Sequence, residues 1–273
     1  MSGTLYVVAT PIGNLEDISP RAVRILGEVD LIACEDTRHT RKLLDRYSIS
    51  KPLISYHEHN EQPRSAELLA DLQAGKNIAL VSDAGTPLIA DPGYRLVEQA
   101  RQQGIAVVAI PGPCALIAAL SASGLPTDSF LFHGFLPPKP GQRRKLLEEL
   151  KPLEATLVFY EAPHRILETL EDIAAILGER LVVLARELTK IHEEFLRGTP
   201  EQLRAALSER SSIKGEFTVM VAKGESAASD DTPLDEAVEK LIESGVPRME
   251  ALKTVARQRG LSKRDVYKKL HER

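Results

Sequence analysis

A carboxylate and a hydroxyl follow an apolar run in the stretch ALVSDAGTPLIADPG, residues 79–93. The run at 78–81 is typical of a buried parallel strand, and the small residues, glycine and proline after it are typical of the loop that ends such a strand. Ligands on α/β sheets bind beyond the carboxyl ends of the strands. Asp83 and Thr86 are therefore candidates for contacting a ligand, and Asp91-Pro92 is expected to begin the next helix. The alternative is a loop that only connects a strand to a helix.

Two further apolar runs end in loops of the same Pro/Gly character. TLYVVA (residues 4–9) leads into TPIGN, and IAVVAI (residues 105–110) leads into PGP. Three such loops at the carboxyl ends of strands indicate one ligand-binding rim more strongly than any single loop does.

Several common nucleotide-binding and catalytic motifs are absent from the sequence. The chain has no G-x-x-x-x-G-K-[ST], no G-x-G-x-x-G after its first strand and no G-x-S-x-G. No Cys/His cluster has the spacing of a zinc site, and His57 with His59 is better explained as a polar loop. Without a lysine or a glycine nest for phosphate, the loops suit a phosphate-free cofactor held by backbone groups. S-adenosylmethionine fits that description, although composition alone does not select it.

The loops must be positioned by the elements around them. Strands and helices alternate along the first part of the chain, which predicts a largely parallel sheet with helices on both faces. A second α/β unit begins near residue 125, and GESAASDDT (residues 224–232) has the composition of a linker. The predicted division is an α/β domain at 1–120, a second α/β domain at 121–224, a linker at 225–232 and a helical tail at 233–273.

The last 28 residues of the tail are basic and the rest of the chain is acidic. Residues 246–273 hold nine Lys/Arg against three Asp/Glu, a net charge of +6, so the rest of the chain carries −10 of the total −4. Three short helices, at 233–244, 247–259 and 263–271, resemble a helix-turn-helix module. They predict contact with a polyanion, mostly through phosphates. The alternative is a solvated pair of amphipathic helices.

Composition sets the remaining limits. With 273 residues, 43% hydrophobic and 27% charged, the chain has the profile of a soluble globular protein. It has no apolar run of the roughly 20 residues that a membrane span needs. The start of the chain does not read as a signal peptide, and two cysteines make neither a disulfide framework nor a metal site. We therefore expect a cytoplasmic, reduced protein.

The motifs together resemble a known family. VVATPIGNLEDIS, ACEDTRHT, SYHEHN, LVSDAGTPLIADPG, IPGPCALIAALSASGLPTDSFLFHGFLPPK, FYEAPHR and GEFTVMVA occur in order. They are similar to the rRNA-methylating branch of the tetrapyrrole methylase family, across essentially the whole chain. The resemblance implies two α/β domains with S-adenosylmethionine in the cleft between them, and a homodimer. It also implies 2′-O-methylation of a cytidine in the decoding centre of 16S rRNA in the small ribosomal subunit, with no DNA partner.

The resemblance also implies site residues. The cofactor would be bound by Pro11, Asp83, Gly85, Thr86, Pro87, Ile89, Cys114, Ala115, Tyr160, Phe217 and Thr218. Ser82 replaces the glycine before the family's Asp, and Ala84-Gly85 stand where a tetrapyrrole-methylating enzyme has Pro. Both departures fit the rRNA branch.

A ribose hydroxyl is a poor nucleophile at neutral pH, so the implied reaction needs a proton acceptor. Asp36, His57 and Asp83 are candidates. We favour Asp36, with Arg38 either positioning phosphate or ribose or serving as a structural partner of Asp36 or Glu35.

Phosphate contacts are expected from cations before and at the start of a helix and from the tail: Lys139, Arg143, Arg144, Lys263, Arg264 and Lys268. Solvated surface is the alternative for each of them.

Two other functions remain open at this point. One is methylation of a tetrapyrrole, against which the basic tail speaks. The other is a non-catalytic RNA-binding assembly factor, against which the intact rim loops speak.

Overall fold

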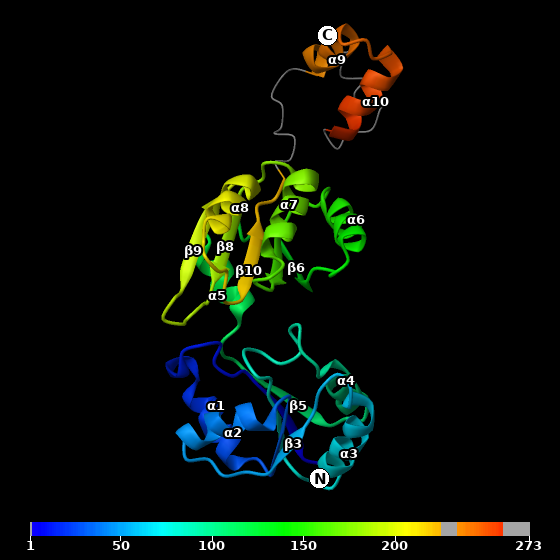
Figure 1. Cartoon of the computed structure of the whole chain (residues 1–273). Helices are drawn as coiled ribbons and strands as arrows, with labels where there is room; N and C mark the ends of the chain where they lie inside the picture. The colour runs from blue at the N-terminus through cyan, green and yellow to red at the C-terminus, as the bar shows by residue number, and fades with distance from the viewer. Residues whose placement is uncertain (1, 225–233, 259–273) are drawn as a thin grey trace. The chain divides into compact units, whose positions relative to one another are not determined.

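A computed structural model describes residues 2–224 and 234–258 of the chain (Figure 1). The chain divides into two compact units, residues 1–222 and 223–273. The first unit contains two five-stranded sheets.

The first sheet is entirely parallel, as the strand–helix alternation predicts. Its strand order is β3-β2-β4-β1-β5. The strands are β1 (Thr4–Val8), β2 (Leu31–Cys34), β3 (Leu53–Ser55), β4 (Ile78–Leu80) and β5 (Ala106–Ile110). One face packs against α1 (Pro20–Glu28) and α2 (Thr37–Arg46), and the other packs against α3 (Glu61–Gln73) and α4 (Tyr94–Gln102). A short 3₁₀ helix, Leu15–Asp17, precedes α1.

Two helix starts of the first sheet bear on the predictions from the sequence. Ser19 caps α1 by accepting a hydrogen bond from the Ala22 backbone N–H, and Pro20 lies in the first turn, where its missing N–H costs nothing. The prediction that α4 begins at Asp91-Pro92 is wrong. That helix begins at Tyr94 after Gly93, whose φ of 134° is open only to glycine. A Cβ on Gly93 would lie 2.8 Å from Leu80 Cδ2, so the chain passes too close to β4 for any other residue.

The second sheet is mixed, with strand order β6-β7-β10-β8-β9. Only β6 and β7 are parallel neighbours, and the other neighbouring strands are antiparallel. The strands are β6 (Phe130–Phe135), β7 (Thr156–Glu161), β8 (Val182–Arg186), β9 (Glu194–Gly198) and β10 (Phe217–Val221). One face packs against α6 (Pro140–Leu150), α7 (Ile166–Leu177) and α8 (Pro200–Ser208).

The helix α5 (Ala115–Ala122) follows the last strand of the first sheet but covers the open face of the second sheet. Its Leu116 and Leu120 pack with Val158, Val183 and Met220. The chain therefore passes from the first sheet to the second in the loop between β5 and α5.

The second unit contains α9 (Leu234–Glu243) and α10 (Arg248–Gln258), two of the three tail helices predicted from the sequence. Val238, Leu252 and Val255 are buried between them. The third predicted helix, 263–271, and the linker at 225–232 lie outside the described residues. Within the described ranges, no helix combines the length and the apolar character needed to span a bilayer.

Candidate active site

The three rim loops predicted from the sequence are joined to one another. Thr10 and Gly85 exchange backbone hydrogen bonds of 2.8 and 3.0 Å between N and O. The Thr86 hydroxyl donates to the Pro113 carbonyl at 2.9 Å. The loops after β1, β4 and β5 therefore form one continuous edge, which confirms that they meet at the carboxyl ends of the strands.

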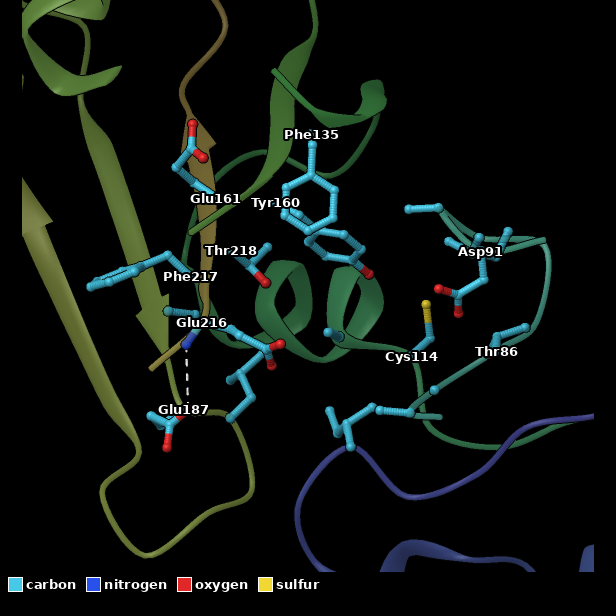
Figure 2. A pocket seen from close by; sticks show the side chains of 18 of the residues that line it. Thr86, Asp91, Cys114, Phe135, Tyr160, Glu161, Glu187, Glu216, Phe217 and Thr218 are labelled. Carbon is cyan, nitrogen blue, oxygen red and sulfur yellow. Dashed lines mark hydrogen bonds between the residues drawn. The ribbon is translucent and has the colours of Figure 1, made fainter. Parts of the chain in front are cut away.

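This edge forms one wall of a cavity of about 240 Å³, and the second sheet forms the other (Figure 2). This volume is just below the roughly 300–1,000 Å³ of typical small-molecule sites. A ligand of about the size of a nucleoside would therefore occupy the whole cavity. The rim wall is made by Ile12, Asp83, Ala84, Gly85, Thr86, Ile89, Ala90, Asp91, Cys114 and Ala115. The opposite wall is made by Phe135, Tyr160, Glu161, Ala185, Glu187, Leu188, Lys190, Glu216, Phe217 and Thr218.

Tyr160 on the opposite wall contacts the start of α5, directly after the rim residues Cys114 and Ala115. Its phenol oxygen accepts the Leu116 backbone N–H at 3.0 Å, which satisfies a donor in the first turn of α5. Its ring meets Phe132 and Phe135 edge-on, with ring centroids 4.9 and 5.8 Å apart. Burial raises the pKa of Tyr160, so this phenol stays neutral at physiological pH.

The loop after β8 also reaches the rim. The Asn14 backbone N–H donates to the Thr189 hydroxyl at 3.0 Å. A Cβ on Gly13 would lie 2.5 Å from Lys190 Cγ, so only glycine permits this approach. Glu187 and Thr189 adopt positive φ angles of 51° and 63°, and such strained residues collect at ligand sites.

The cavity is acidic. Its lining holds five carboxylates, Asp83, Asp91, Glu161, Glu187 and Glu216, against one cation, Lys190. Such a lining attracts a cationic ligand and repels phosphates. Within the described part of the chain, no three or more His, Cys, Asp or Glu side chains are grouped to hold a metal ion.

Four of these carboxylates are already engaged. Glu187 pairs with Lys190 at 2.8 Å, which lowers the pKa of Glu187, and Glu216 lies 3.7 Å from the same ammonium. Glu161 is fully buried and accepts from the Thr169 hydroxyl at 2.6 Å, among other donors. Asp83 Oδ1 accepts the Asp36 backbone N–H at 3.0 Å, which ties the loop after β4 to the loop after β2. These contacts fix the shape of the lining.

Asp91 differs from the other four carboxylates. Burial, followed by the nearby charges of Glu35 and Asp83, raises its pKa to about 6, against a hydrogen bond from Ser82 that lowers it. It lies on the rim wall, and Figure 2 shows its carboxylate directed into the cavity near Cys114.

The family profile described as Tetrapyrrole (Corrin/Porphyrin) Methylases matches residues 4–204. The chain belongs to the tetrapyrrole methylase family. It is 52% identical to ribosomal RNA small subunit methyltransferase I of Halalkalibacterium halodurans, with 99% of this chain and 95% of the relative covered. It is 50% identical to the protein of the same name from Escherichia coli O157:H7, over 97% of this chain and 94% of that one.

A solved tetrapyrrole methylase structure shares the fold at low sequence identity. It is uroporphyrin-III C-methyltransferase from Thermus thermophilus, complexed with S-adenosylhomocysteine. It superposes with a TM-score of 0.56 at 18% identity, covering 80% of this chain and 97% of that one. This likeness confirms the fold class predicted from the sequence.

The structure places nine of the eleven predicted cofactor residues in the lining of the cavity: Asp83, Gly85, Thr86, Ile89, Cys114, Ala115, Tyr160, Phe217 and Thr218. Pro11 and Pro87 are not among the lining residues; Ile12, beside Pro11, lines the cavity instead. The roles of these residues in a tetrapyrrole methylase site remain predictions.

The predicted catalytic pair lies outside the cavity lining. Asp36 caps α2 and accepts from the Arg38 guanidinium, at 3.1 Å from Nε and 2.7 Å from Nη2. These hydrogen bonds hold the pKa of Asp36 well below its usual range, which makes it a weak proton acceptor. The pairing with Arg38 argues against Asp36 as the base and for the structural alternative, and the catalytic role of Asp36 stays a prediction.

The third candidate base, His57, also lies outside the lining. It is in the turn after β3, not on a strand, and its Nε2 lies 3.1 Å from the Asn60 side-chain nitrogen. Asn60 Nδ2 can only donate, so Nε2 is the acceptor in this contact. This ring is thus engaged in the turn.

Among the predicted phosphate contacts, Arg143 is corrected. Its side chain is only 2% exposed and pairs with Asp172 at 2.5 Å between Nε and Oδ2, so it cannot reach an external phosphate. Lys139 and Arg144 are exposed and stay proposals. Lys263, Arg264 and Lys268 lie outside the described residues.

Sequence reasoning missed Asp91, Phe135, Glu187 and Lys190 as lining residues. The Asp-Pro pair looked like a helix start, which hid Asp91. The tetrad Glu187-Leu188-Thr189-Lys190 directly follows β8, and that position at a strand end was the signal that could have found it.

Proposed function

We propose that this protein transfers the methyl group of S-adenosylmethionine to rRNA of the small ribosomal subunit, at the 2′-oxygen of a cytidine in the decoding centre of 16S rRNA. The proposal rests on sequence identity. Over nearly its full length, the chain is 50–52% identical to proteins named ribosomal RNA small subunit methyltransferase I. The same proposal includes action in the cytoplasm, where ribosomal subunits are, and a homodimeric state.

The cavity suits S-adenosylmethionine by charge and by surface. The cofactor carries a sulfonium and an ammonium against one carboxylate, so the acidic lining complements its net positive charge. Ile12 and Ile89 offer apolar surface to its adenosine part, and the backbone groups of the rim loops offer hydrogen bonds. When bound, the cofactor supplies an electrophilic methyl group next to a good leaving group.

The protein would then have two tasks: to orient the reacting atoms and to accept the proton of the ribose hydroxyl. Holding the reacting atoms in line converts a bimolecular step into a unimolecular one, which contributes up to about 7–11 kcal/mol. The joined rim loops and the Tyr160 contact supply the rigid frame that such alignment needs. A ribose hydroxyl also needs a proton acceptor as it attacks.

The direct test uses small subunits from cells that lack this protein and S-adenosylmethionine with a radiolabelled methyl group. The RNA is digested with alkali, which does not cleave beside a 2′-O-methyl. We expect a labelled resistant dinucleotide that contains cytidine. Label without a resistant dinucleotide would mean base methylation. Absence of label in RNA, with label transferred to a uroporphyrinogen, would mean a tetrapyrrole substrate.

The tail provides a separate prediction. Because α9 and α10 share one buried cluster, truncation after Lys223 removes the whole second unit cleanly, whereas a cut at Val246 would expose that cluster. We expect the truncated protein to bind small-subunit RNA more weakly, by about tenfold or more at moderate salt, because cationic phosphate contacts are lost. Its affinity for S-adenosylhomocysteine should be unchanged. Equal RNA affinity of the two proteins in filter binding would contradict the role of the tail.

A further inference from the structure

Asp91 occupies a position that helix formation does not explain. The residue precedes a proline in a pattern typical of a helix start, yet the helix begins three residues later at Tyr94. Leu88 and Ala90, just before it, have positive φ angles of 74° and 66°, a conformation that costs energy in residues with a side chain. The loop after β4 thus holds Asp91 on the cavity wall instead of at a cap.

Asp91 is also the cavity carboxylate that is least committed elsewhere. Glu187 and Glu216 face the Lys190 ammonium, Glu161 accepts from Thr169, and Asp83 accepts from the Asp36 backbone. Across residues 2–224 and 234–258, Asp91 forms no ion pair, and the neighbouring Ser82 hydroxyl, which lowers the pKa of Asp91, is also within reach of the Ala84 and Gly85 carbonyls at 3.3 and 3.4 Å.

The titratable groups that face Asp91 come from several elements. Glu35 after β2 and Asp83 after β4 are acidic, and both raise the pKa of Asp91. Tyr160 on β7 also faces Asp91, and the Asp91 charge adds to the rise in the pKa of its phenol that burial causes. Burial and these neighbours bring the pKa of Asp91 to about 6. A carboxylate in this range is ionised at physiological pH and is a stronger base than an ordinary aspartate.

We propose that Asp91 is the proton acceptor for the ribose hydroxyl. This inference rests on the proposed function. In the step, the ribose oxygen forms a bond to the methyl carbon, and the carbon–sulfur bond breaks with its electron pair kept by sulfur. The hydroxyl proton moves to an Asp91 carboxylate oxygen, which releases it to water after the products leave. The product sulfur is a neutral thioether.

The test compares wild type, Asp91→Asn and Asp45→Asn in single turnovers with saturating S-adenosylmethionine and prebound small subunits. Asp45 is exposed near the end of α2, so its variant is a matched loss of one carboxylate away from the cavity. Removal of a general base typically costs about 10²–10⁴-fold, so we expect Asp91→Asn to be at least about 100-fold slower. Asp45→Asn should match wild type. Calorimetric binding of S-adenosylhomocysteine should be retained by all three.

The pH dependence separates a base from a structural group. The wild-type rate should fall as the pH drops through about 6, because protonated Asp91 cannot accept a proton. The residual rate of Asp91→Asn should lack that fall. A rate within threefold of wild type, or the same acid fall in the variant, would overturn the proposal. If wild type itself does not methylate RNA, the proposed function fails first, and this inference fails with it.

Discussion

Gly85→Val is expected to weaken the binding of S-adenosylhomocysteine by at least about 30-fold, the equivalent of about 2 kcal/mol. Gly85 has a φ of 86°, where a β-branched residue is strained. Its added Cβ would lie 3.3 Å from Ile12 Cγ2 and 3.8 Å from the Pro113 carbonyl. The contact with Ile12 is tighter than an ordinary van der Waals contact, so the substitution strains the junction of the loops after β1 and β4 at the residue that pairs with Thr10.

Gly104→Val is the matched control for this experiment. Gly104 also has a positive φ, 71°, but nothing lies within 4 Å of a Cβ built there, and the residue is exposed after α4. Both variants carry the cost of a left-handed residue, about 1–2 kcal/mol of stability. Only Gly85→Val also disturbs the cavity. Titration calorimetry that finds the same affinity for the two variants would show that the junction of the rim loops does not shape the ligand site.

The sequence was sufficient to predict what depends on local pattern. Alternating strands and helices specify the parallel first sheet, because consecutive parallel strands need a crossover and the helices cover both faces. The loops after β1, β4 and β5 were recognisable because glycine, proline and small residues follow apolar runs. That these loops meet follows from their shared place at the carboxyl ends of neighbouring strands.

Residue roles that depend on tertiary contacts could not be predicted from the sequence. The motif EDTRHT looked catalytic, yet Asp36 has the two ordinary tasks of capping α2 and pairing with Arg38. Asp91 looked like a cap, yet Gly93 takes that place because the chain passes against Leu80. Charge and spacing do not reveal which face of a helix is buried. The neighbouring residues Arg143 and Arg144 differ in this respect. One guanidinium is in the core and its neighbour is 59% exposed.

Arg143→Met is expected to lower the free energy of unfolding by about 3 kcal/mol, measured by urea denaturation. The substitution leaves Asp172, whose side chain is 2% exposed, without its shortest partner. The value is at the lower end for a broken buried pair because Arg144 Nε still contacts Asp172 at 2.6 Å. Lys145→Met, on the same helix and 80% exposed, should change stability by no more than about 0.5 kcal/mol.

The double variant Arg143→Met/Asp172→Leu decides between a structural and an RNA-contacting arginine. When both partners of a buried pair become apolar, no uncompensated charge remains, so the double variant should be more stable than either single variant. If Arg143 acts only through Asp172, the double variant should also bind small-subunit RNA with wild-type affinity. Loss of RNA affinity in a stably folded double variant would mean that the guanidinium leaves its pocket to meet phosphate. Its burial between α6 and α7 argues that it does not.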